Sequence, residues 1–392
     1  MKEVLICAHK MHCGGTEKAL LSFLANVDFR RYDVTLLLEK IEGEWLDKLP
    51  KEVKLKELIP LRKKDYVYLL DLCPYKSSLG KKWFKFRTWL HAFMRSHLKR
   101  TYESYYRKVL KKIEREEKGY DYALDFFGYG YFLTGYVAEK VNARKKATWI
   151  HSLDLLGARH VKGFYANYDK VFCVSNAVKE RFDAEYPEYA DKSQVVYNEI
   201  NYDEILRLAE EKVDDVEQNK NLIVSVGRLS HEKGFDFSVD VAKELRSRQV
   251  DFKWIIVGDG IEKDELSQRI KDYGLSDSVI LLGRKDNPYP YMKKAKLYVQ
   301  TSRLEGFGLT VAEAKTLGRV VVATDLPSFR EQIIDGETGF IVELNSENFA
   351  DKISELLREE SDDYKRVERN LQIENTKKIN NGKINIEKQF EN

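Results

Sequence analysis

The feature that most constrains the fold is a repeated alternation between short apolar, β-branched runs and longer segments with helical spacing. Such runs are typical of buried strands, and helices between them make each connection a crossover. The pattern therefore predicts an α/β protein with parallel sheets covered by helices. Strands are predicted at residues 4–8, 32–38, 122–126, 146–150, 170–174, 221–226, 252–257, 279–282, 297–300, 320–323 and 340–342. Helices are predicted at residues 16–25, 176–185, 234–248, 262–273, 310–317 and 346–359.

The chain has 392 residues, enough for two domains of ordinary size. Strand signal fades at residues 198–219, where Glu, Asp and Lys dominate. We therefore predict an N-terminal Rossmann-like domain over residues 1–198 and a C-terminal one over residues 199–375. Residues 376–392 form a charged tail that becomes rich in Asn and Lys.

Composition excludes several classes of protein. No stretch approaches twenty apolar residues, so no transmembrane helix is predicted. The apolar part of residues 1–8 is too short for a secretion signal and is better interpreted as a strand. The four cysteines, Cys7, Cys13, Cys73 and Cys173, show no metal-ligand spacing, which indicates a reducing cytoplasm and argues against a zinc site.

The most informative stretch follows the predicted strand at 297–300 and reads SRLEGFGLTVAEA over residues 302–314. Glu305 stands at the turn into the next helix, and Glu313 lies within that helix. Backbone N–H groups at such a helix start favour a diphosphate, and the two carboxylates suit sugar hydroxyls. The alternative is a glycine-rich turn with two solvated carboxylates, since the spacing alone is a weak motif. The candidate donor-binding residues are Glu305, Gly306, Phe307, Gly308, Leu309 and Glu313.

A second glycine-bearing turn carries two cations. Residues 224–234 read VSVGRLSHEKG, with Arg228 and Lys233 after an apolar run. Cations near a helix start oppose the macrodipole, so their placement indicates a bound anion. Arg suits bidentate phosphate binding and Lys supplies a point charge. The alternative is a pair of solvated charges.

Gly14 and Gly15 follow the first predicted strand and open a helix. Glycine lets the backbone approach a phosphate closely, although a plain strand-to-helix turn would have the same composition. The dinucleotide fingerprint GxGxxG is absent there, which disfavours a nicotinamide oxidoreductase.

Together with the segment WIIVGDG at residues 254–260, these motifs occur in an order that resembles the retaining GT-B glycosyltransferases of family 4, also called glycosyl transferases group 1. The resemblance covers most of the chain. It implies two Rossmann-like domains that face a central cleft, with a final helix returning to the first domain, where residues 384–390 are the candidate remnant. Ligands of open α/β sheets bind beyond the carboxyl ends of the strands, where each motif falls.

The resemblance also implies individual roles. Arg228 and Lys233 would bind the donor diphosphate, and the loop with Gly14 and Gly15 would touch the donor phosphate and the acceptor. Glu305 would hold donor sugar hydroxyls and Glu313 the ribose hydroxyls.

His151 stands where family members carry a histidine that contacts the donor sugar, although a lone histidine after a strand is often structural. Arg284 occupies the position whose backbone contacts the nucleotide base. The expected catalytic residues are thus Glu305, His151, Arg228 and Lys233.

Positive charge is concentrated in residues 76–118, which hold 14 Lys or Arg and 4 Glu, a net charge of +10 in a chain of +3. Apolar residues, many of them aromatic, recur there at helical spacing. A basic amphipathic helix is typical of a peripheral membrane contact, but a core-facing helix pair with a basic outer face fits equally well. No nucleic-acid motif accompanies the charge, so no nucleic-acid partner is expected.

From the resemblance we expect a hexosyltransferase-type enzyme that moves a sugar from a UDP- or GDP-sugar to a polysaccharide or lipid-linked acceptor, as in capsule or other cell-envelope synthesis. A cytoplasmic location, with peripheral contact at the inner membrane face, accompanies this expectation. No D-x-D motif stands at a strand end, so no metal site or other cofactor is expected. A GT-B epimerase or hydrolase and a non-catalytic nucleotide-sugar-binding subunit are the alternatives.

Overall fold

The structure is a computed structural model that describes residues 1–58, 103–128, 130, 132–216, 219–359, 361–378 and 383–391. By internal contacts the chain separates into two compact units. The first comprises Met1–Val174, Val178–Tyr197 and Lys383–Asn392, and the second comprises Ser175–Ala177 and Asn198–Gly382.

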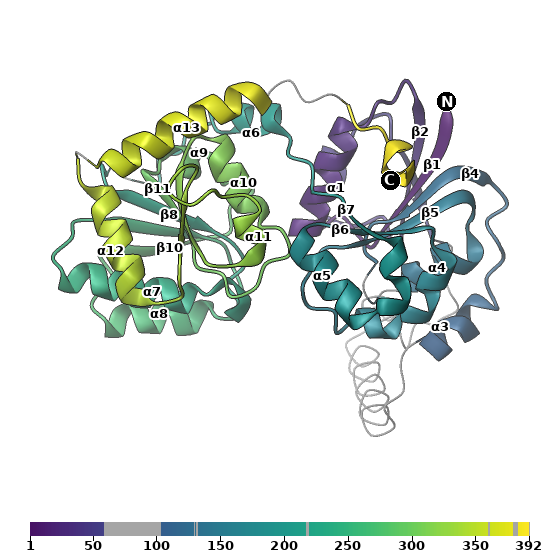
Figure 1. Cartoon of the computed structure of the whole chain (residues 1–392), viewed down its shortest axis with the longest axis horizontal. Helices are drawn as coiled ribbons and strands as arrows, with labels where there is room; N and C mark the ends of the chain where they lie inside the picture. The colour runs from purple at the N-terminus through teal and green to yellow at the C-terminus, as the bar shows by residue number, and fades with distance from the viewer. Residues whose placement is uncertain are drawn as a thin grey trace. The chain divides into compact units, whose positions relative to one another are not determined.

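Within the described residues, the first unit has a seven-stranded parallel sheet in the order β3-β2-β1-β4-β5-β6-β7 (Figure 1). Its strands are β1 (Lys2–Ala8), β2 (Tyr32–Leu38), β3 (Lys54–Glu57), β4 (Gly119–Asp125), β5 (Asn142–Ile150), β6 (Lys170–Cys173) and β7 (Ser193–Val195). Its helices are α1 (Gly15–Asn26), α3 (Glu103–Leu110), α4 (Phe132–Lys140) and α5 (Asn176–Glu185). The central strand β1 is buried from Val4 to Ala8, because β2 and β4 flank it and helices cover the sheet.

The described part of the second unit has a six-stranded parallel sheet in the order β10-β9-β8-β11-β12-β13. Its strands are β8 (Leu222–Val226), β9 (Lys253–Val257), β10 (Val279–Gly283), β11 (Leu297–Gln300), β12 (Val320–Thr324) and β13 (Phe340–Val342). Its helices are α6 (Tyr202–Leu208), α7 (Phe235–Ser247), α8 (Lys263–Asp272), α9 (Tyr289–Lys294), α10 (Leu309–Thr316), α11 (Pro327–Arg330), α12 (Ser346–Leu357) and α13 (Asp362–Lys378).

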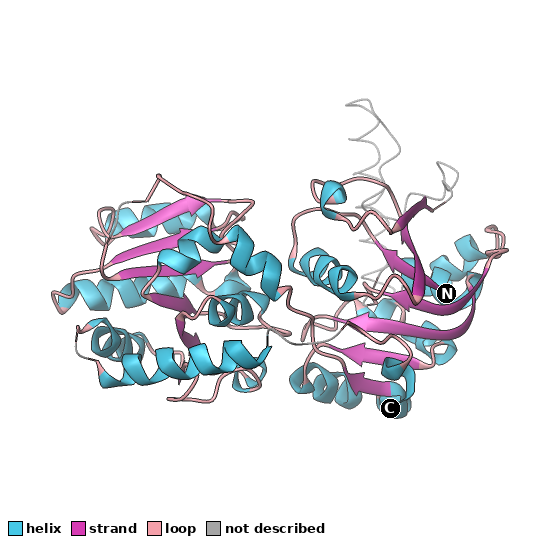
Figure 2. Ribbon diagram, turned by 90° about the horizontal axis from the view of Figure 1, so that it is seen from above, coloured by secondary structure: helices cyan, strands magenta, loops and turns pink. Residues whose placement is uncertain are grey.

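Alternate strand residues of this second sheet enter two separate cores, as the period of two along a strand requires. Trp254 and Ile256 pack with α7, α8, α12 and α13, whereas Ile255 and Val257 pack with α6, α9, α10 and α11. Figure 2 shows the strands of this unit between helices on both sides. Both faces of the strands are buried, which explains their almost continuous apolar runs.

The end of the chain packs on the first unit. Ile384 forms a parallel bridge with Val27, and Tyr32 donates a hydrogen bond of 3.0 Å to the side chain of Asn385. The Phe390 ring, in the short helix α14 (Lys388–Glu391), lies 5.1 Å from the ring of Tyr122. These contacts attach residues 383–391 to the first unit.

Of the basic segment 76–118, residues 76–102 lie outside the described residues. The described remainder begins with α3, which buries Tyr106, Val109 and Leu110 and packs against α4. The apolar stripe of this part therefore serves internal packing.

Candidate functional site

Two glycine-bearing turns meet at the carboxyl edge of the second sheet. One follows β8 and contains the short 3-10 helix η6 (His231–Lys233), and the other connects β11 to α10. The strands β8 and β11 are paired, with Leu297 opposite Ile223 and Tyr298 opposite Val224. Because parallel strands end at the same edge, this pairing brings the two turns together.

Hydrogen bonds hold these turns in place. The Arg303 N–H donates to the Glu232 carbonyl at 2.7 Å, and the Arg303 guanidinium binds both carboxylate oxygens of Asp236 at 2.6 and 2.7 Å. Gly234 has φ +65°, and a Cβ there would lie 2.1 Å from the Thr301 carbonyl oxygen. Only glycine allows this approach, so the turn after β8 rests directly on the end of β11.

Glu305 and Lys233 form an ion pair between the turns. Lys233 Nζ lies 2.5 Å from Glu305 Oε1, and the Ser302 hydroxyl donates to the same oxygen at 2.8 Å. The Glu305 side chain is 8% exposed and that of Lys233 is 26% exposed. Burying a carboxylate to this degree is costly unless such donors bind its oxygens. An ammonium has three N–H donors, so Lys233 can also bind a ligand oxygen.

Arg228 lies on the same turn and is exposed. Among the residues that the structure describes, it makes no ion pair. The turn itself is fixed by Leu229, whose N–H donates to the Asp259 carbonyl at 3.0 Å, and by Gly258, where a Cβ would lie 1.8 Å from the Gly227 carbonyl oxygen. A fixed backbone thus presents a guanidinium that has no counter-ion within the described part of the chain.

The helix α10 begins after Gly308, which has φ +86° and stands against the Phe329 ring. Glu313 lies in this helix and is 2% exposed. The Tyr289 hydroxyl, at the start of α9, lies 3.4 Å from Glu313 Oε1. Glu313 is therefore held inside the unit, whereas Gly306 and Phe307 in the preceding turn, and Leu309 at the first position of α10, remain half-buried.

Arg284 follows β10, two strands from β8 at the same sheet edge. It comes directly after Gly283, which has φ +76°. Its guanidinium lies 3.7 Å from Asp286.

The remaining predicted residues lie in the first unit. Gly14 precedes α1, and its carbonyl accepts the Lys18 N–H at 3.0 Å, so Gly15 occupies the first turn of that helix. His151 follows β5 and packs on two rings, with its centroid 5.0 Å from Phe126 and 5.9 Å from Trp149.

His151 is held neutral. Burial lowers the pKa of its imidazole to about 3, and a hydrogen bond with the Phe126 backbone opposes this only in part. Its Nε2 is buried and has no hydrogen-bond partner among the described residues. If Nδ1 carries the proton toward the Phe126 carbonyl, Nε2 presents a lone pair that can accept a hydrogen bond from a hydroxyl group.

The structure adds polar residues that the sequence did not indicate. Asp125, at the end of β4, is fully buried and accepts hydrogen bonds from the Thr148 hydroxyl at 2.9 Å and the Tyr168 hydroxyl at 3.4 Å. Burial raises the pKa of its carboxyl to about 6. The one feature of the sequence that could have indicated Asp125 is its position near the carboxyl end of a predicted strand, where polar site residues of parallel sheets lie.

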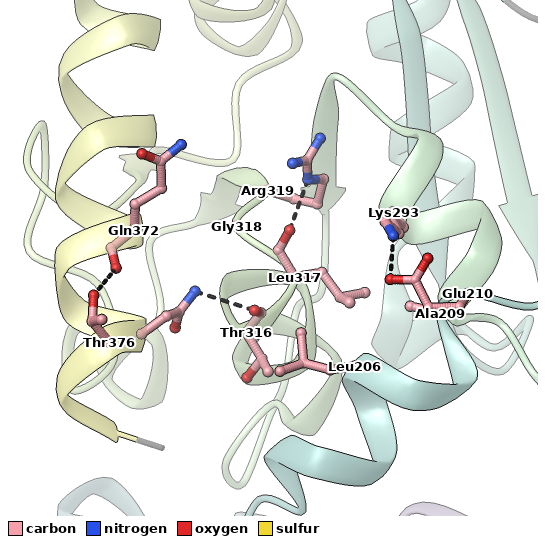
Figure 3. A pocket seen from close by; sticks show the side chains of 11 residues that line it. Leu206, Ala209, Glu210, Lys293, Thr316, Leu317, Gly318, Arg319, Gln372 and Thr376 are labelled. Carbon is pink, nitrogen blue, oxygen red and sulfur yellow. Dashed lines mark hydrogen bonds and ion pairs between the residues drawn. The ribbon is translucent and has the colours of Figure 1, made fainter. Parts of the chain in front are cut away.

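A hollow of about 340 Å³ lies elsewhere in the second unit, at the end of α10 opposite Gly308 (Figure 3). Its polar lining includes the Lys293–Glu210 ion pair of 2.6 Å and Asn375, which donates to the Thr316 carbonyl at 3.1 Å. None of the predicted site residues lines this hollow.

Residues 207–378 match the family described as glycosyl transferases group 1. A Campylobacter jejuni relative, N-acetylgalactosamine-N,N'-diacetylbacillosaminyl-diphospho-undecaprenol 4-alpha-N-acetylgalactosaminyltransferase, is 35% identical over 158 residues, which are 40% of this chain and 42% of the relative. The poly(ribitol-phosphate) alpha-N-acetylglucosaminyltransferase of Staphylococcus aureus is 32% identical over 142 residues, 36% of this chain and 29% of the relative. The chain thus spans less than half the length of these two relatives.

Solved structures share the whole fold. Anabaena Alr3699/HepE in complex with UDP and glucose has a TM-score of 0.69 at 19% identity, covering 96% of this chain and 95% of that one. TarM has a TM-score of 0.65 at 15% identity, covering 96% of each chain. These likenesses confirm the predicted GT-B fold class of two Rossmann-like domains.

Proposed function

We propose that this chain, in which residues 207–378 match the glycosyl transferases group 1 family, transfers a sugar from a nucleotide-sugar donor to a polysaccharide or lipid-linked acceptor in cell-envelope glycan synthesis. The observation that carries the proposal is the Lys233–Glu305 ion pair, which lies beside the start of α10 and beside Arg228, an exposed cation with no ion-pair partner among the described residues. Cations and a buried carboxylate at one sheet edge suit a ligand with both phosphates and hydroxyls. The UDP and glucose bound to the HepE structure lend support.

In the proposed mechanism, Arg228 and Lys233 stabilise the negative charge that develops on the departing nucleoside diphosphate. Glu305 accepts hydrogen bonds from donor sugar hydroxyls, and Glu313 accepts them from the ribose. His151, neutral at physiological pH, accepts a hydrogen bond from a hydroxyl group through Nε2.

We infer a retaining reaction, in which the acceptor oxygen attacks the face that the diphosphate leaves. The bond between the anomeric carbon and the acceptor oxygen forms as the bond to the phosphate oxygen breaks. The acceptor proton passes to that phosphate oxygen. Comparing the anomeric configuration of donor and product by NMR tests this directly, and inversion would refute it.

Two cations at the leaving group also supply the charge that a divalent ion supplies in other transferases. We therefore propose that turnover needs no metal. Activity should be the same after exhaustive treatment with EDTA, and restoration by added Mg²⁺ or Mn²⁺ would contradict the proposal.

The central test is donor binding followed by turnover. UDP-, GDP- and ADP-sugars are screened for thermal stabilisation, since a ligand at a hundred times its dissociation constant adds about 2.7 kcal/mol to stability. The stabilising donor is then incubated with a polyprenyl-diphosphate-linked saccharide, and the elongated product is measured. Stabilisation without product, in the presence of several such acceptors, would favour a non-catalytic binding subunit.

We further propose peripheral contact with the inner face of the cell membrane. None of the described helices is long and apolar enough to cross a membrane. Since α3 uses its apolar side internally, the proposal depends on residues 76–102, which hold eight Lys or Arg and no acidic residue. Cations near an anionic leaflet contribute about 1 kcal/mol each.

Co-sedimentation with phosphatidylglycerol vesicles should be strong at low salt and decline as salt screens the charge. Vesicles of phosphatidylcholine serve as the control. Absence of the protein from the anionic vesicle pellet at low salt would refute the membrane contact without affecting the transfer reaction.

A further inference from the structure

A chain of buried hydrogen bonds runs along β11 and ends at Glu305. The Tyr298 hydroxyl donates to Gln300 Oε1 at 2.8 Å, and Gln300 Nε2 donates to the Ser302 hydroxyl at 2.7 Å. The Ser302 hydroxyl then donates to Glu305 Oε1 at 2.8 Å. Tyr298, Gln300 and Ser302 are all fully buried.

The spacing of these residues follows from strand geometry. Successive side chains of a strand point to opposite faces, so residues two apart share a face. Tyr298 and Gln300 therefore share one face of β11, and the hydrogen bonds continue to Ser302, which lies two residues beyond the end of the strand in the turn that carries Glu305. Thr310, in the first turn of α10, joins the row by donating to Gln300 Oε1 at 3.2 Å.

The chemistry of the groups gives the chain one direction. An ionised carboxylate only accepts hydrogen bonds, so Ser302 must give its single proton to Glu305. The Ser302 oxygen then accepts, and the amide nitrogen of Gln300 is the donor it meets. That choice turns the Gln300 carbonyl oxygen toward Tyr298 and Thr310, both of which can donate.

The protonation of Tyr298 agrees with this direction. Burial raises the pKa of its hydroxyl, and this effect outweighs the hydrogen bonds with Thr310 and the Val226 backbone, which lower it; the nearby charges of Glu313 and Glu305 add to the rise. Tyr298 therefore keeps its proton and remains a donor at physiological pH.

At the other end, Glu305 Oε1 accepts from both Ser302 and Lys233. Among the described residues, no hydrogen bond reaches Oε2. The two bonds to one oxygen set the plane of the carboxylate and leave the second oxygen for another donor.

We infer that Gln300 and Ser302 are positioning residues that hold Glu305 so that Oε2 accepts a hydroxyl of the donor sugar. The identity of the ligand, a donor sugar, rests on the proposed function, whereas the direction of the hydrogen bonds from Tyr298 to Glu305 does not. The alternative is a purely structural role, in which these buried polar groups only satisfy one another's hydrogen bonds. They would then stabilise the unit to the same extent but would not affect recognition of the sugar.

Three variants separate these cases. Gln300→Leu removes the donor to Ser302. Gln300→Glu keeps the acceptor for Tyr298 but replaces the donor with a second carboxylate, so two carboxylates compete for the Ser302 proton. Ser225→Ala is the matched control, because Ser225 is equally buried and bonds Val299 of β11 at 2.5 Å without touching the chain.

The first measurement needs no ligand. Urea unfolding of Gln300→Leu, Glu305→Gln and the double variant gives a double-mutant cycle for two residues that touch only through Ser302. We expect non-additive losses for this pair and additive losses when Ser225→Ala replaces Gln300→Leu. Additivity in both cycles would refute the energetic coupling of Gln300 to Glu305 through Ser302.

The second measurement is calorimetric titration with whichever of UDP-, GDP- or ADP-glucose binds the wild-type protein, and with its free nucleoside diphosphate. In Gln300→Leu we expect the sugar nucleotide to bind about tenfold more weakly, equivalent to about 1.4 kcal/mol, while the diphosphate changes by less than about twofold. Equal changes for both ligands would overturn the positioning role.

The pH dependence provides a signature that a structural role would lack. In Gln300→Glu the sugar nucleotide should bind more weakly than in Gln300→Leu near pH 8, and recover as the pH falls and the introduced carboxyl becomes a donor to Ser302. Absence of this recovery would refute the direction of the chain. A wild-type protein that binds none of these nucleotides would refute the proposed function, and the unfolding cycles would still decide whether the chain exists.

Discussion

Neutral His151 should make the first unit sensitive to acid, and replacing this histidine with glutamine should remove that sensitivity. The imidazole packs on Phe126 and Trp149, and burial lowers its pKa from 6.5 to about 3. Gln can still donate to the Phe126 backbone but does not titrate, so His151→Gln isolates the protonation of the ring.

The sign follows from proton linkage. The folded pKa is depressed, so between about pH 6.5 and 3 the unfolded chain binds a proton that folded His151 does not. Stability is therefore lost as the pH falls below 6.5. Between pH 7 and pH 5, a shift of this size corresponds to a loss of about 2 kcal/mol.

Asp125 acts in the opposite direction. Burial raises the pKa of its carboxyl from 3.8 to about 6, so the folded state binds a proton before the unfolded state does. Its contribution to stability is present at low pH and is lost as the pH rises through 6. Acidification from pH 7 to pH 5 should therefore add about 1 kcal/mol through Asp125.

The two contributions partly cancel in the wild-type protein, where His151 and Asp125 together should cost about 1 kcal/mol of stability over this range. Removing either group exposes the other. His151→Gln should become more stable by about 1 kcal/mol on acidification, and Asp125→Asn should become less stable by about 2 kcal/mol. Titrating groups common to all three proteins cancel in the differences.

The assay is urea unfolding at pH 7 and pH 5, with hydrogen exchange of the β4 and β5 amides reporting the first unit, because two units need not unfold together. Exchange rates are corrected for their intrinsic pH dependence. Parallel pH profiles for the wild-type protein and His151→Gln would refute the depressed histidine pKa, and with it the proposed lone pair on Nε2.

Arg228→Ala and Lys233→Ala should each lower turnover by about a hundredfold or more, as loss of preorganised charge does. Lys293→Ala, which removes an exposed cation of the same unit, is the control and should leave turnover unchanged. Wild-type rates in either site variant would contradict the assignment of Arg228 and Lys233 to the donor diphosphate. Glu313→Gln should weaken calorimetric binding of the free nucleoside diphosphate and of the sugar nucleotide alike. Glu305→Gln should weaken only the latter, and identical losses in the two variants would remove the division of roles.

The sequence predicted the central strands well, because their burial on both faces leaves a clear apolar record. The run predicted at 297–300 is β11 itself, and 320–323 differs from β12 by one residue. The short strands β3 and β7 were missed. β3, with the sequence KLKE, is polar and largely exposed at the sheet edge, and an edge strand needs no apolar pattern.

The site was predictable in its turns and not in its contacts. Glycines at 234 and 308 adopt positive φ, which is the constraint that made the turns recognisable. The contact between Lys233 and Glu305 depends instead on β8 and β11 being neighbours, although β9 and β10 lie between them in the sequence. Strand order is set by the packing of the whole unit, so no local pattern could have indicated this ion pair.

The row on β11 shows how such a site could be recognised in other sequences. A strand in the middle of a parallel sheet is covered on both faces and should be apolar on both. Leu297 and Val299 obey this rule on one face, whereas Tyr298 and Gln300 depart from it on the other, and Ser302 continues the polar row just beyond the strand. Buried polar groups are costly unless each is hydrogen-bonded, so a row of them persists only where the bonds are completed. Here they are completed by the Glu305 carboxylate at the carboxyl edge of the sheet, where we propose that the donor sugar binds, so the departure from the apolar pattern is the feature to look for in other sequences.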